Sequence, residues 1–147
     1  WLLRSNPARV FARGIETFSP GMPTPDSFHV LLRFANGSMA TLEWSYALHR
    51  RGDTLRRIVV VGERGTLHHS TQGEMDLHSD AARPVAIATL DAFGHQMRHF
   101  ADVLNGASPL VTPKQIRGAF SAALAAQESY ATGRAVEIGA VAGENGA

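Results

Sequence analysis

The sequence contains no cysteine, and this absence removes several kinds of chemistry. Disulfides, thiolate nucleophiles and cysteine-based zinc or iron–sulfur sites are excluded. Lysine occurs once, as Lys114, and the formal net charge is +1, so no strong field favours nucleic acid or anionic membranes. The chain also lacks an apolar run near the roughly 20 residues of a membrane span and a signal-like start. We therefore expect a cytoplasmic protein.

What is present is typical of a globular domain. The 147 residues are 44% apolar and 18% charged, which favours a single domain, residues 1–147, with a core of its own. The opening run Trp1-Leu2-Leu3-Arg4, ended by Ser5-Asn6-Pro7, is typical of the tail of a helix. We interpret residues 1–5 as the remnant of an upstream helix, and the chain as a piece of a longer protein. Residues 139–147 are small and polar and predict a frayed tail.

The first part of the chain predicts strands. The alternation of residues 10–18 predicts a strand, and the prolines and glycine of 19–25 predict a loop. Residues 27–48 predict a β-hairpin around Asn36-Gly37. A two-residue turn would pair Ala35 with Ser38, whereas a three-residue loop with Gly37 in the left-handed region pairs Phe34 with Ser38. Burial of one apolar face should decide the register, and we favour the three-residue loop.

In that register the hairpin has two different faces. The apolar face carries Phe28, Val30, Leu32 and Phe34 with Ala40, Leu42 and Trp44. The opposite face carries His29, Leu31 and Arg33 with Met39, Thr41, Glu43 and Ser45.

Further strands are predicted at residues 55–61, 66–69, 74–78 and 84–90. The run Ile58-Val59-Val60-Val61 suggests a central position for the first of these. The links are short, so the sheet should be largely antiparallel.

Two helices are predicted after the strands. Asp91 can cap a helix running to Asn105, and its residues Phe93, Met97, Phe100 and Leu104 form one apolar stripe. Thr112-Pro113-Lys114-Gln115 is a strong helix start, and Gly133 is a stop. Residues 135–138 can return as a strand. The fold class predicted is α+β, a largely antiparallel sheet with helices packed on one face. The inner face expected for the second helix consists of Ile116, Phe120, Ala123, Leu124 and Gln127.

Four groups of residues are candidates for chemistry. His95, His99 and Asp102 have helical spacing and types that can bind zinc, but they lie away from the apolar stripe, where solvated residues belong. Neighbouring His68 and His69 point to opposite faces of a strand, so they cannot easily chelate together and at least one should be exposed.

Glu43 and His29 become cross-strand neighbours in the favoured register. They are either an acid–base pair or an ordinary sheet pair. Gly62 and Gly65 follow an apolar strand, but without G-x-G-x-x-G or a following helix they indicate a tight turn. The residues alone give no complete active site, so we assign no catalytic, cofactor-binding or metal-binding residue.

Three segments together resemble a known family. They are residues 26–42 around the hairpin, Val61-Gly-Glu-Arg-Gly-Thr-Leu67, and residues 93–138 with their Thr-Gly-Arg-x-Val-Glu-Ile ending. In order and spacing they resemble the C-terminal domain of the Gfo/Idh/MocA family of NAD(P)-dependent oxidoreductases.

The resemblance implies a two-domain enzyme acting on a sugar, inositol or related polyol. A Rossmann domain would hold NAD or NADP, and the C-terminal domain would close over substrate and build the oligomer, a dimer through its sheet. The family's G-x-G-x-x-G, E-K-P and Asp/His motifs are absent here. No family catalytic residue is therefore carried onto this chain, Lys114 included. We expect no cofactor in this fragment and no activity from it alone.

Two other hypotheses stay open at this point. The chain could be a standalone, non-catalytic binding or assembly module of the same fold. It could also be a metal-dependent enzyme using His95, His99 and Asp102.

Overall fold

The computed structural model describes residues 2–16, 21, 24–46, 56–70, 76–78 and 91–139, with residues 76–78 as backbone only. The chain forms two compact units, residues 1–48 with 108–147, and residues 49–107. The predicted strand at 84–90, most of the predicted loop at 19–25 and nearly all of the predicted tail at 139–147 lie outside the described residues. The antiparallel strands and two helices confirm the predicted α+β class. No helix in these ranges is both long enough and apolar enough to cross a membrane.

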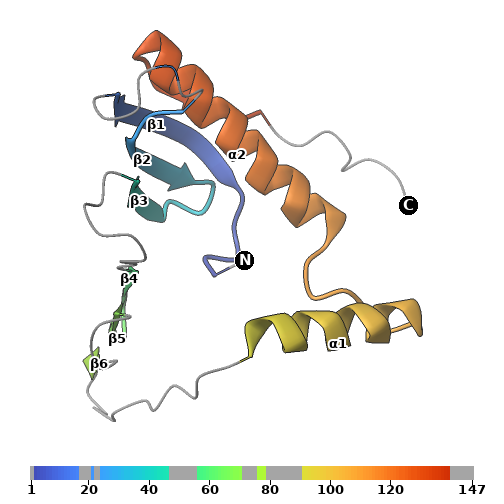
Figure 1. The fold of residues 1–147 in the computed structure, drawn as a ribbon. Coiled ribbons are helices and arrows are strands. Elements are labelled where there is room, and N and C mark those ends of the chain that lie inside the picture. Colours follow the sequence, from blue (N-terminus) through green and yellow to red (C-terminus); the bar gives the residue numbers. More distant parts are fainter. Residues whose placement is uncertain are drawn as a thin grey trace. The chain divides into compact units, whose positions relative to one another are not determined.

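The first unit is a four-stranded antiparallel sheet with one helix lying along it (Figure 1). Its strands are β1 (Pro7–Ile15), β2 (Ser27–Phe34), β3 (Met39–Ser45) and β7 (Val136–Glu137), in the order β3-β2-β1-β7. The helix is α2 (Pro113–Thr132). Strand β1 begins and ends about three residues before the predicted one because pairing with β2 starts at Pro7.

The hairpin of β2 and β3 has the predicted register. The backbone N–H of Phe34 donates to the carbonyl oxygen of Ser38 at 2.9 Å, and Gly37 has φ 85°. His29 lies opposite Glu43 and Val30 opposite Leu42, as the three-residue loop requires. The predicted apolar face turns inward, with Phe28, Val30 and Leu32 buried.

The ends of α2 follow the predicted signals. Thr112 accepts a hydrogen bond from the backbone N–H of Gln115, and the Gln115 side chain accepts one from the backbone N–H of Thr112. This reciprocal capping box satisfies two helix-end donors. At the other end Gly133 adopts φ 70°, the left-handed conformation that closes a helix at low steric cost.

The predicted inner face of α2 is wrong. Ile116, Phe120 and Leu124 are 47%, 67% and 63% exposed, and Ala123 and Gln127 are also exposed. The buried residues of α2 are instead Gly118, Ala125, Ala126 and Ser129. Small side chains let the helix backbone approach β1 closely, so proximity to the sheet selects this face over the bulkier stripe.

The core of the first unit lies between α2 and the inner sheet face. Its buried apolar members come from β1, β2 and α2: Val10, Ala12, Phe28, Val30, Leu32, Ala125 and Ala126. Phe28 also packs against Trp44, with ring centroids 4.8 Å apart, and edge-on against Tyr130 at 5.6 Å. The core is therefore centred on β1 and β2, and β3 contributes less to it.

The second unit contains a three-stranded antiparallel sheet and one helix. The strands are β4 (Arg57–Gly62), β5 (Gly65–Ser70) and β6 (Asp76–His78), in the order β4-β5-β6. Among the described residues β4 pairs with β5 alone and Val61 is 78% exposed, so the predicted central position of the Ile58–Val61 strand is not seen within this part of the chain. Helix α1 (Ala92–Leu104) is capped by Asp91, which accepts from the backbone N–H of Gly94, as predicted. Its apolar stripe, Phe93, Met97, Phe100 and Leu104, is exposed.

Candidate functional site: an apolar groove and an uncovered sheet face

A groove opens beside α2 on the inner side of the sheet. Helix α2 packs on β1 and β7, and beside it lie β2, whose inner residues are buried, and β3, whose inner side is largely uncovered. The groove between these strands and the helix has a volume of about 1040 Å³. It lies wholly within the first unit. Its lining residues come from the N-terminal segment (Leu2, Arg4, Ser5, Asn6, Pro7), the hairpin (Val30, Leu32, Phe34, Leu42, Trp44) and α2 with its cap (Thr112, Lys114, Gln115, Gly118, Ala119, Ala122, Ala123, Ala126).

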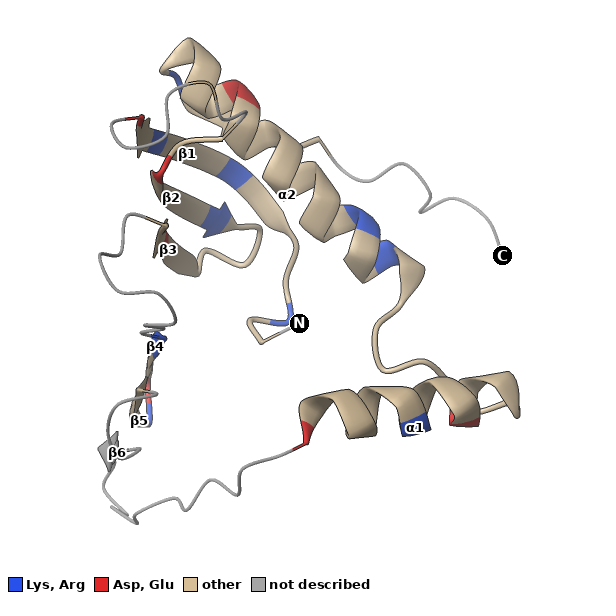
Figure 2. Ribbon diagram, viewed as in Figure 1, with Lys and Arg blue, Asp and Glu red and all other residues tan. Residues whose placement is uncertain are grey.

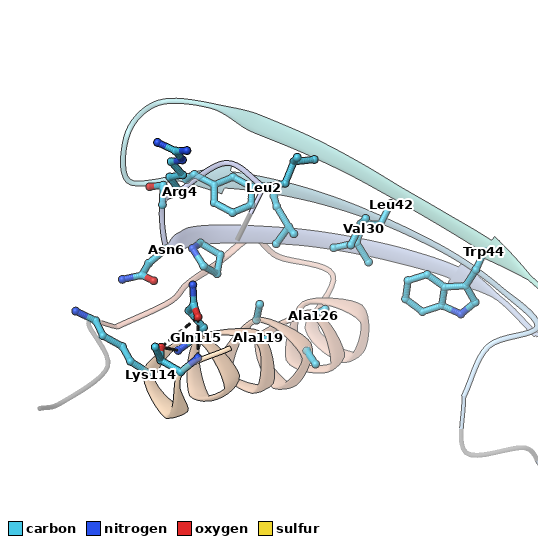
Figure 3. Close-up of a pocket in the computed structure, with 18 residues that line it drawn as sticks. Leu2, Arg4, Asn6, Val30, Leu42, Trp44, Lys114, Gln115, Ala119 and Ala126 are labelled. Atoms are coloured by element: carbon cyan, nitrogen blue, oxygen red, sulfur yellow. Dashed lines mark hydrogen bonds between the residues drawn. The ribbon is translucent and has the colours of Figure 1, made fainter. Parts of the chain in front are cut away.

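The groove is apolar along its length and polar at one end (Figure 3). Val30, Leu42 and Trp44 project from the strands toward the small side chains of α2. Leu42 is 47% exposed and Trp44 is 41% exposed, although both lie on the face that the sequence assigns to the core. Large apolar side chains left half in water on an inner face indicate a surface shaped to be covered.

The N-terminal segment is fixed at the polar end of the groove. The side-chain amide of Asn36 donates to the carbonyl oxygen of Leu3 at 3.2 Å, and the backbone N–H of Asn36 donates to the Ser5 hydroxyl at 3.2 Å. The backbone N–H of Ala35 donates to the carbonyl oxygen of Asn6 at 3.0 Å. The hairpin turn therefore holds residues 3–6 in place.

Among the described residues of the first unit, no helix packs on the outer face of the same sheet. One cross-strand row places Phe11 opposite Leu31, and a second places Arg13 opposite His29. Ile15 and Met39 are also exposed there. Arg9 and Glu137 form an ion pair at 3.1 Å on neighbouring strands. Figure 2 shows that basic positions occur on β1 and β2 of this sheet. The face combines exposed apolar side chains with charges of both signs.

Among the candidate side chains that the structure describes, His29 and Glu43 lie next to each other. The His29 Nε2 and Glu43 Oε1 atoms are 3.9 Å apart, so the predicted cross-strand neighbours are confirmed. Their side chains are 53% and 69% exposed on the open outer face, which offers no enclosed space for a substrate. This geometry is that of a surface sheet pair.

The other candidates do not converge. In the ranges that the structure describes, no three His, Asp or Glu side chains approach one another closely enough to hold a metal, His95, His99 and Asp102 included. His68 is exposed and pairs opposite Val59, while His69 pairs opposite Ile58, so the two imidazoles lie on opposite faces, as predicted.

The remaining glycine pair is a turn, and the single lysine lines the groove. Gly62 pairs directly with Gly65 in the hairpin of β4 and β5, which confirms the predicted tight turn. A strand follows Gly65, so no helix N-terminus is aimed at a phosphate. These residues do not fit a dinucleotide. Lys114 lies at the polar end of the groove.

Sequence reasoning missed the groove itself. The alternation along β2 and β3 correctly marks the inward residues Val30, Leu42 and Trp44, but alternation does not say what covers them. The groove could have been found by comparing the width of one helix with the width of the predicted sheet. A helix is about 10 Å across, so it cannot cover four strands spaced about 4.8 Å apart.

In a comparison with protein families, residues 1–68 match the family model described as the GFO/IDH/MocA C-terminal domain. This match covers somewhat less than half of the chain. The resemblance drawn from the hairpin and the Val61–Leu67 turn is confirmed by this match. A search of curated proteins found no match.

Solved structures resemble this chain over most of its length, and at their low sequence identity they show a shared fold alone. An oxidoreductase from Agrobacterium radiobacter, in complex with NAD+, L-tartaric acid and magnesium, superposes with a TM-score of 0.72 at 23% identity over 92% of this chain and 44% of its own. Aldose-aldose oxidoreductase from Caulobacter crescentus, complexed with glycerol, gives 0.71 at 20% identity over 90% and 42%. UDP-N-acetylglucosamine 3-dehydrogenase from Acidithiobacillus ferrooxidans gives 0.75 at 16% identity over 87% and 41%. This chain spans less than half the length of each of these relatives.

Proposed function

We propose that this chain is the C-terminal substrate-binding and oligomerisation domain of an NAD(P)-dependent oxidoreductase acting on a sugar, inositol or related polyol. One observation carries the proposal. The first 68 residues match the Gfo/Idh/MocA C-terminal domain, and 87% to 92% of the chain superposes on oxidoreductases of which it covers only 41% to 44%. Two of those proteins act on sugars or sugar nucleotides by name, and one was solved with NAD+.

The chemistry of such an enzyme would lie outside these residues. Hydride transfer needs a nicotinamide held against the substrate carbon, and the Gly62–Gly65 turn does not fit a dinucleotide phosphate. His29 and Glu43 stand on an open face without a cavity. The role left to this chain is to shape the substrate side of the active site and to assemble subunits. The fragment by itself would be inactive.

The outer sheet face would be the assembly surface. Phe11, Ile15, Leu31 and Met39 expose apolar area there, and the rows of Arg13, His29 and Glu43 supply charges of both signs. A two-fold interface places the same patch against itself, so a patch carrying both signs can be self-complementary. We propose a homodimer formed through this face, in the cytoplasm.

The test compares the 147-residue chain with the longer polypeptide that contains it. Each is purified and assayed for oxidation and reduction of NAD(P)(H) with a panel of aldoses, inositols and sugar acids. We expect turnover by the longer polypeptide and none by the 147-residue chain. Turnover by the 147-residue chain alone, or failure of the longer polypeptide to bind NAD or NADP, would contradict the proposal.

A further inference from the structure

We propose that His29 and Glu43 on the outer sheet face form half of a zinc site, which a second copy of this chain completes across a two-fold axis. The inference rests on the proposed function, because it takes the outer face to be the homodimer interface. It adds the ligand of that interface, a divalent transition-metal ion, and makes assembly depend on it.

The first argument is that two metal-ligating side chains already lie side by side. His29 and Glu43 are direct cross-strand neighbours on β2 and β3, and the Nε2 atom of His29 lies 3.9 Å from the Oε1 atom of Glu43. This separation is longer than a hydrogen bond. Two ligand atoms that each lie about 2.0–2.1 Å from one zinc ion are about 3.3 Å apart in a tetrahedral site. A small rotation of either side chain therefore lets both atoms bind one ion.

The second argument is that the neighbouring cation is held elsewhere. Arg13 lies opposite His29 on β1 and would repel a metal ion if it faced the pair. Its guanidinium instead donates to the carbonyl oxygen of Gly133 at 3.0 Å, and its Cζ atom lies 4.9 Å from the ring centroid of Phe11. Gly133 precedes β7, which flanks β1 on the side away from β2. The positive charge of Arg13 is therefore directed away from the pair.

The third argument is that a second copy supplies the ligands that one chain lacks. Structural zinc sites have four protein ligands, and within the described ranges no three His, Asp or Glu side chains gather in one chain. A two-fold axis that runs along β2, between two facing sheets, sets His29 against its own copy. Because β1 and β3 flank β2, this axis leaves the two Glu43 side chains on opposite sides of it.

The resulting arrangement suits a tetrahedral ion. Facing sheets lie about 10 Å apart, which leaves room for two imidazoles with one ion between them. The imidazoles approach from the two sheets and the carboxylates from the two flanks, so the four ligands surround one point. Two neutral imidazoles and two carboxylates are a ligand set that zinc accepts.

The fourth argument is charge. The Glu43 side chain is 69% exposed in the single chain, so water solvates its carboxylate. Closing the interface removes that water from two copies of Glu43, and a carboxylate buried without a partner is costly. One divalent cation on the axis neutralises both carboxylates. The ion would therefore stabilise the dimer and have no comparable site on the monomer.

The test measures the effect of zinc on assembly. The 147-residue chain, without an affinity tag, is stripped with a chelator and studied by sedimentation equilibrium with and without Zn²⁺. Equilibrium dialysis gives the number of zinc ions bound per chain. His29→Gln and Glu43→Gln each remove one ligand at an exposed position, and circular dichroism checks that both variants fold. His95→Gln, which removes an exposed imidazole on α1, is the matched control.

We expect one zinc ion per two chains, and a dimer dissociation constant lowered at least tenfold by Zn²⁺ in the unsubstituted chain and in His95→Gln. In His29→Gln and Glu43→Gln, Zn²⁺ should change the constant by less than twofold. One zinc ion per chain would overturn the inference, as would a zinc effect that survives in His29→Gln and is lost in His95→Gln. A dimer that Zn²⁺ leaves unchanged would also overturn it, and would leave the partner's Arg13 as the counter-charge of Glu43.

The outcomes separate this inference from the proposed function. NAD(P) binding is measured on the longer polypeptide that contains the chain. Cofactor binding together with a dimer that does not respond to Zn²⁺ defeats only this inference. A zinc-dependent dimer that is lost in His29→Gln, in a longer polypeptide that binds neither NAD nor NADP, defeats only the assignment to an oxidoreductase.

Discussion

The backbone N–H of Ala12 donates a hydrogen bond of 2.9 Å to the hydroxyl oxygen of Ser129, and that hydroxyl donates to the carbonyl oxygen of Arg134 at 2.5 Å. Strand β7 pairs Val136 with Val10 and begins there, so a longer ladder in this register would have placed Arg134 opposite Ala12. Because β7 is too short to pair Arg134 with Ala12, the fully buried Ser129 hydroxyl links the N–H of Ala12 to the carbonyl oxygen of Arg134 instead. One hydroxyl thus ties α2 to β1 and to the segment that leads into β7.

Ser129→Ala should lower the free energy of unfolding by about 1–3 kcal/mol, because it leaves the buried N–H of Ala12 without an acceptor. Urea denaturation followed by circular dichroism measures the change. Ser121→Ala, two turns earlier on the same helix, removes the same atoms away from Ala12 and should change the free energy by less than about 0.5 kcal/mol. Equal effects of the two variants would show that the Ser129 bridge contributes nothing specific.

Gly133→Ala should destabilise the first unit through the backbone. Gly133 has φ 70°, and a Cβ added there would lie 3.0 Å from a guanidinium nitrogen of Arg13, whose other terminal nitrogen donates to the Gly133 carbonyl oxygen. The left-handed conformation alone costs a residue with a Cβ about 1–2 kcal/mol. Gly139→Ala is the matched control, since its added Cβ meets no described atom within 4 Å. We expect a lower thermal midpoint for Gly133→Ala only, and a shift of the same size in both variants would contradict this account.

Ala125→Leu tests which face of α2 is buried. Ala125 is 8% exposed against the sheet, so three extra carbon atoms would overpack the contact and cost about 1–3 kcal/mol. Ala131→Leu makes the same change at an exposed position of the helix and should cost less than about 0.5 kcal/mol. The free energies come from chemical denaturation of both variants. Had Ile116, Phe120 and Leu124 faced the core, Ala125→Leu would be tolerated as well.

The local features of the first unit could be predicted from sequence. Thr112 and Gln115 predict the start of α2 because a capping box is a local interaction, and Gly133 predicts its end. The hairpin register could also be predicted, because only one alignment places Ala40, Leu42 and Trp44 on the same face as Phe28, Val30 and Leu32.

The inner face of α2 could not be predicted, for a physical reason. Hydrophobic size favours the stripe of Ile116, Phe120 and Leu124, whereas the contact with β1 depends on how closely the helix backbone can approach. That distance is set by Val10 and Ala12 on a strand more than a hundred residues away. The groove could not be predicted for a related reason. How many strands one helix covers depends on the strand order and on where the helix packs, and both are known only from the assembled sheet.

Tyr130 should titrate above the ordinary range of a tyrosine. Its hydroxyl donates a hydrogen bond to the Glu16 carboxylate, and this bond, followed by desolvation and the negative charge of Glu16, raises the pKa of Tyr130 above 10.0. The chain has two tyrosines, so Tyr46→Phe leaves Tyr130 as the sole phenol for ultraviolet absorbance titration. Adding Glu16→Gln to that variant should bring the pKa down toward 10.0, because the carboxylate charge is lost.

The same shift fixes the sign of a pH effect on stability. Because the folded state holds the Tyr130 proton more tightly than the unfolded state, the contribution is fully present below pH 10.0 and is lost as the pH rises through the folded pKa. Unfolding experiments across that window should show a steeper loss of stability with Glu16 than with Glu16→Gln. Identical slopes would mean that the hydrogen bond to Glu16 is not maintained in solution.

Leu31→Arg should weaken the homodimer proposed for the outer sheet face. Leu31 pairs opposite Phe11 at the middle of that face and is 40% exposed, so a guanidinium there would meet its own copy across a two-fold axis and add like charge. Sedimentation equilibrium should report a dimer dissociation constant raised at least tenfold. Leu124→Arg introduces the same side chain at an exposed leucine on α2, on the other side of the sheet, and should leave the constant within twofold. A dimer weakened by Leu124→Arg and unaffected by Leu31→Arg would move the interface to the helix side, and a monomer at all concentrations would remove the assembly role altogether.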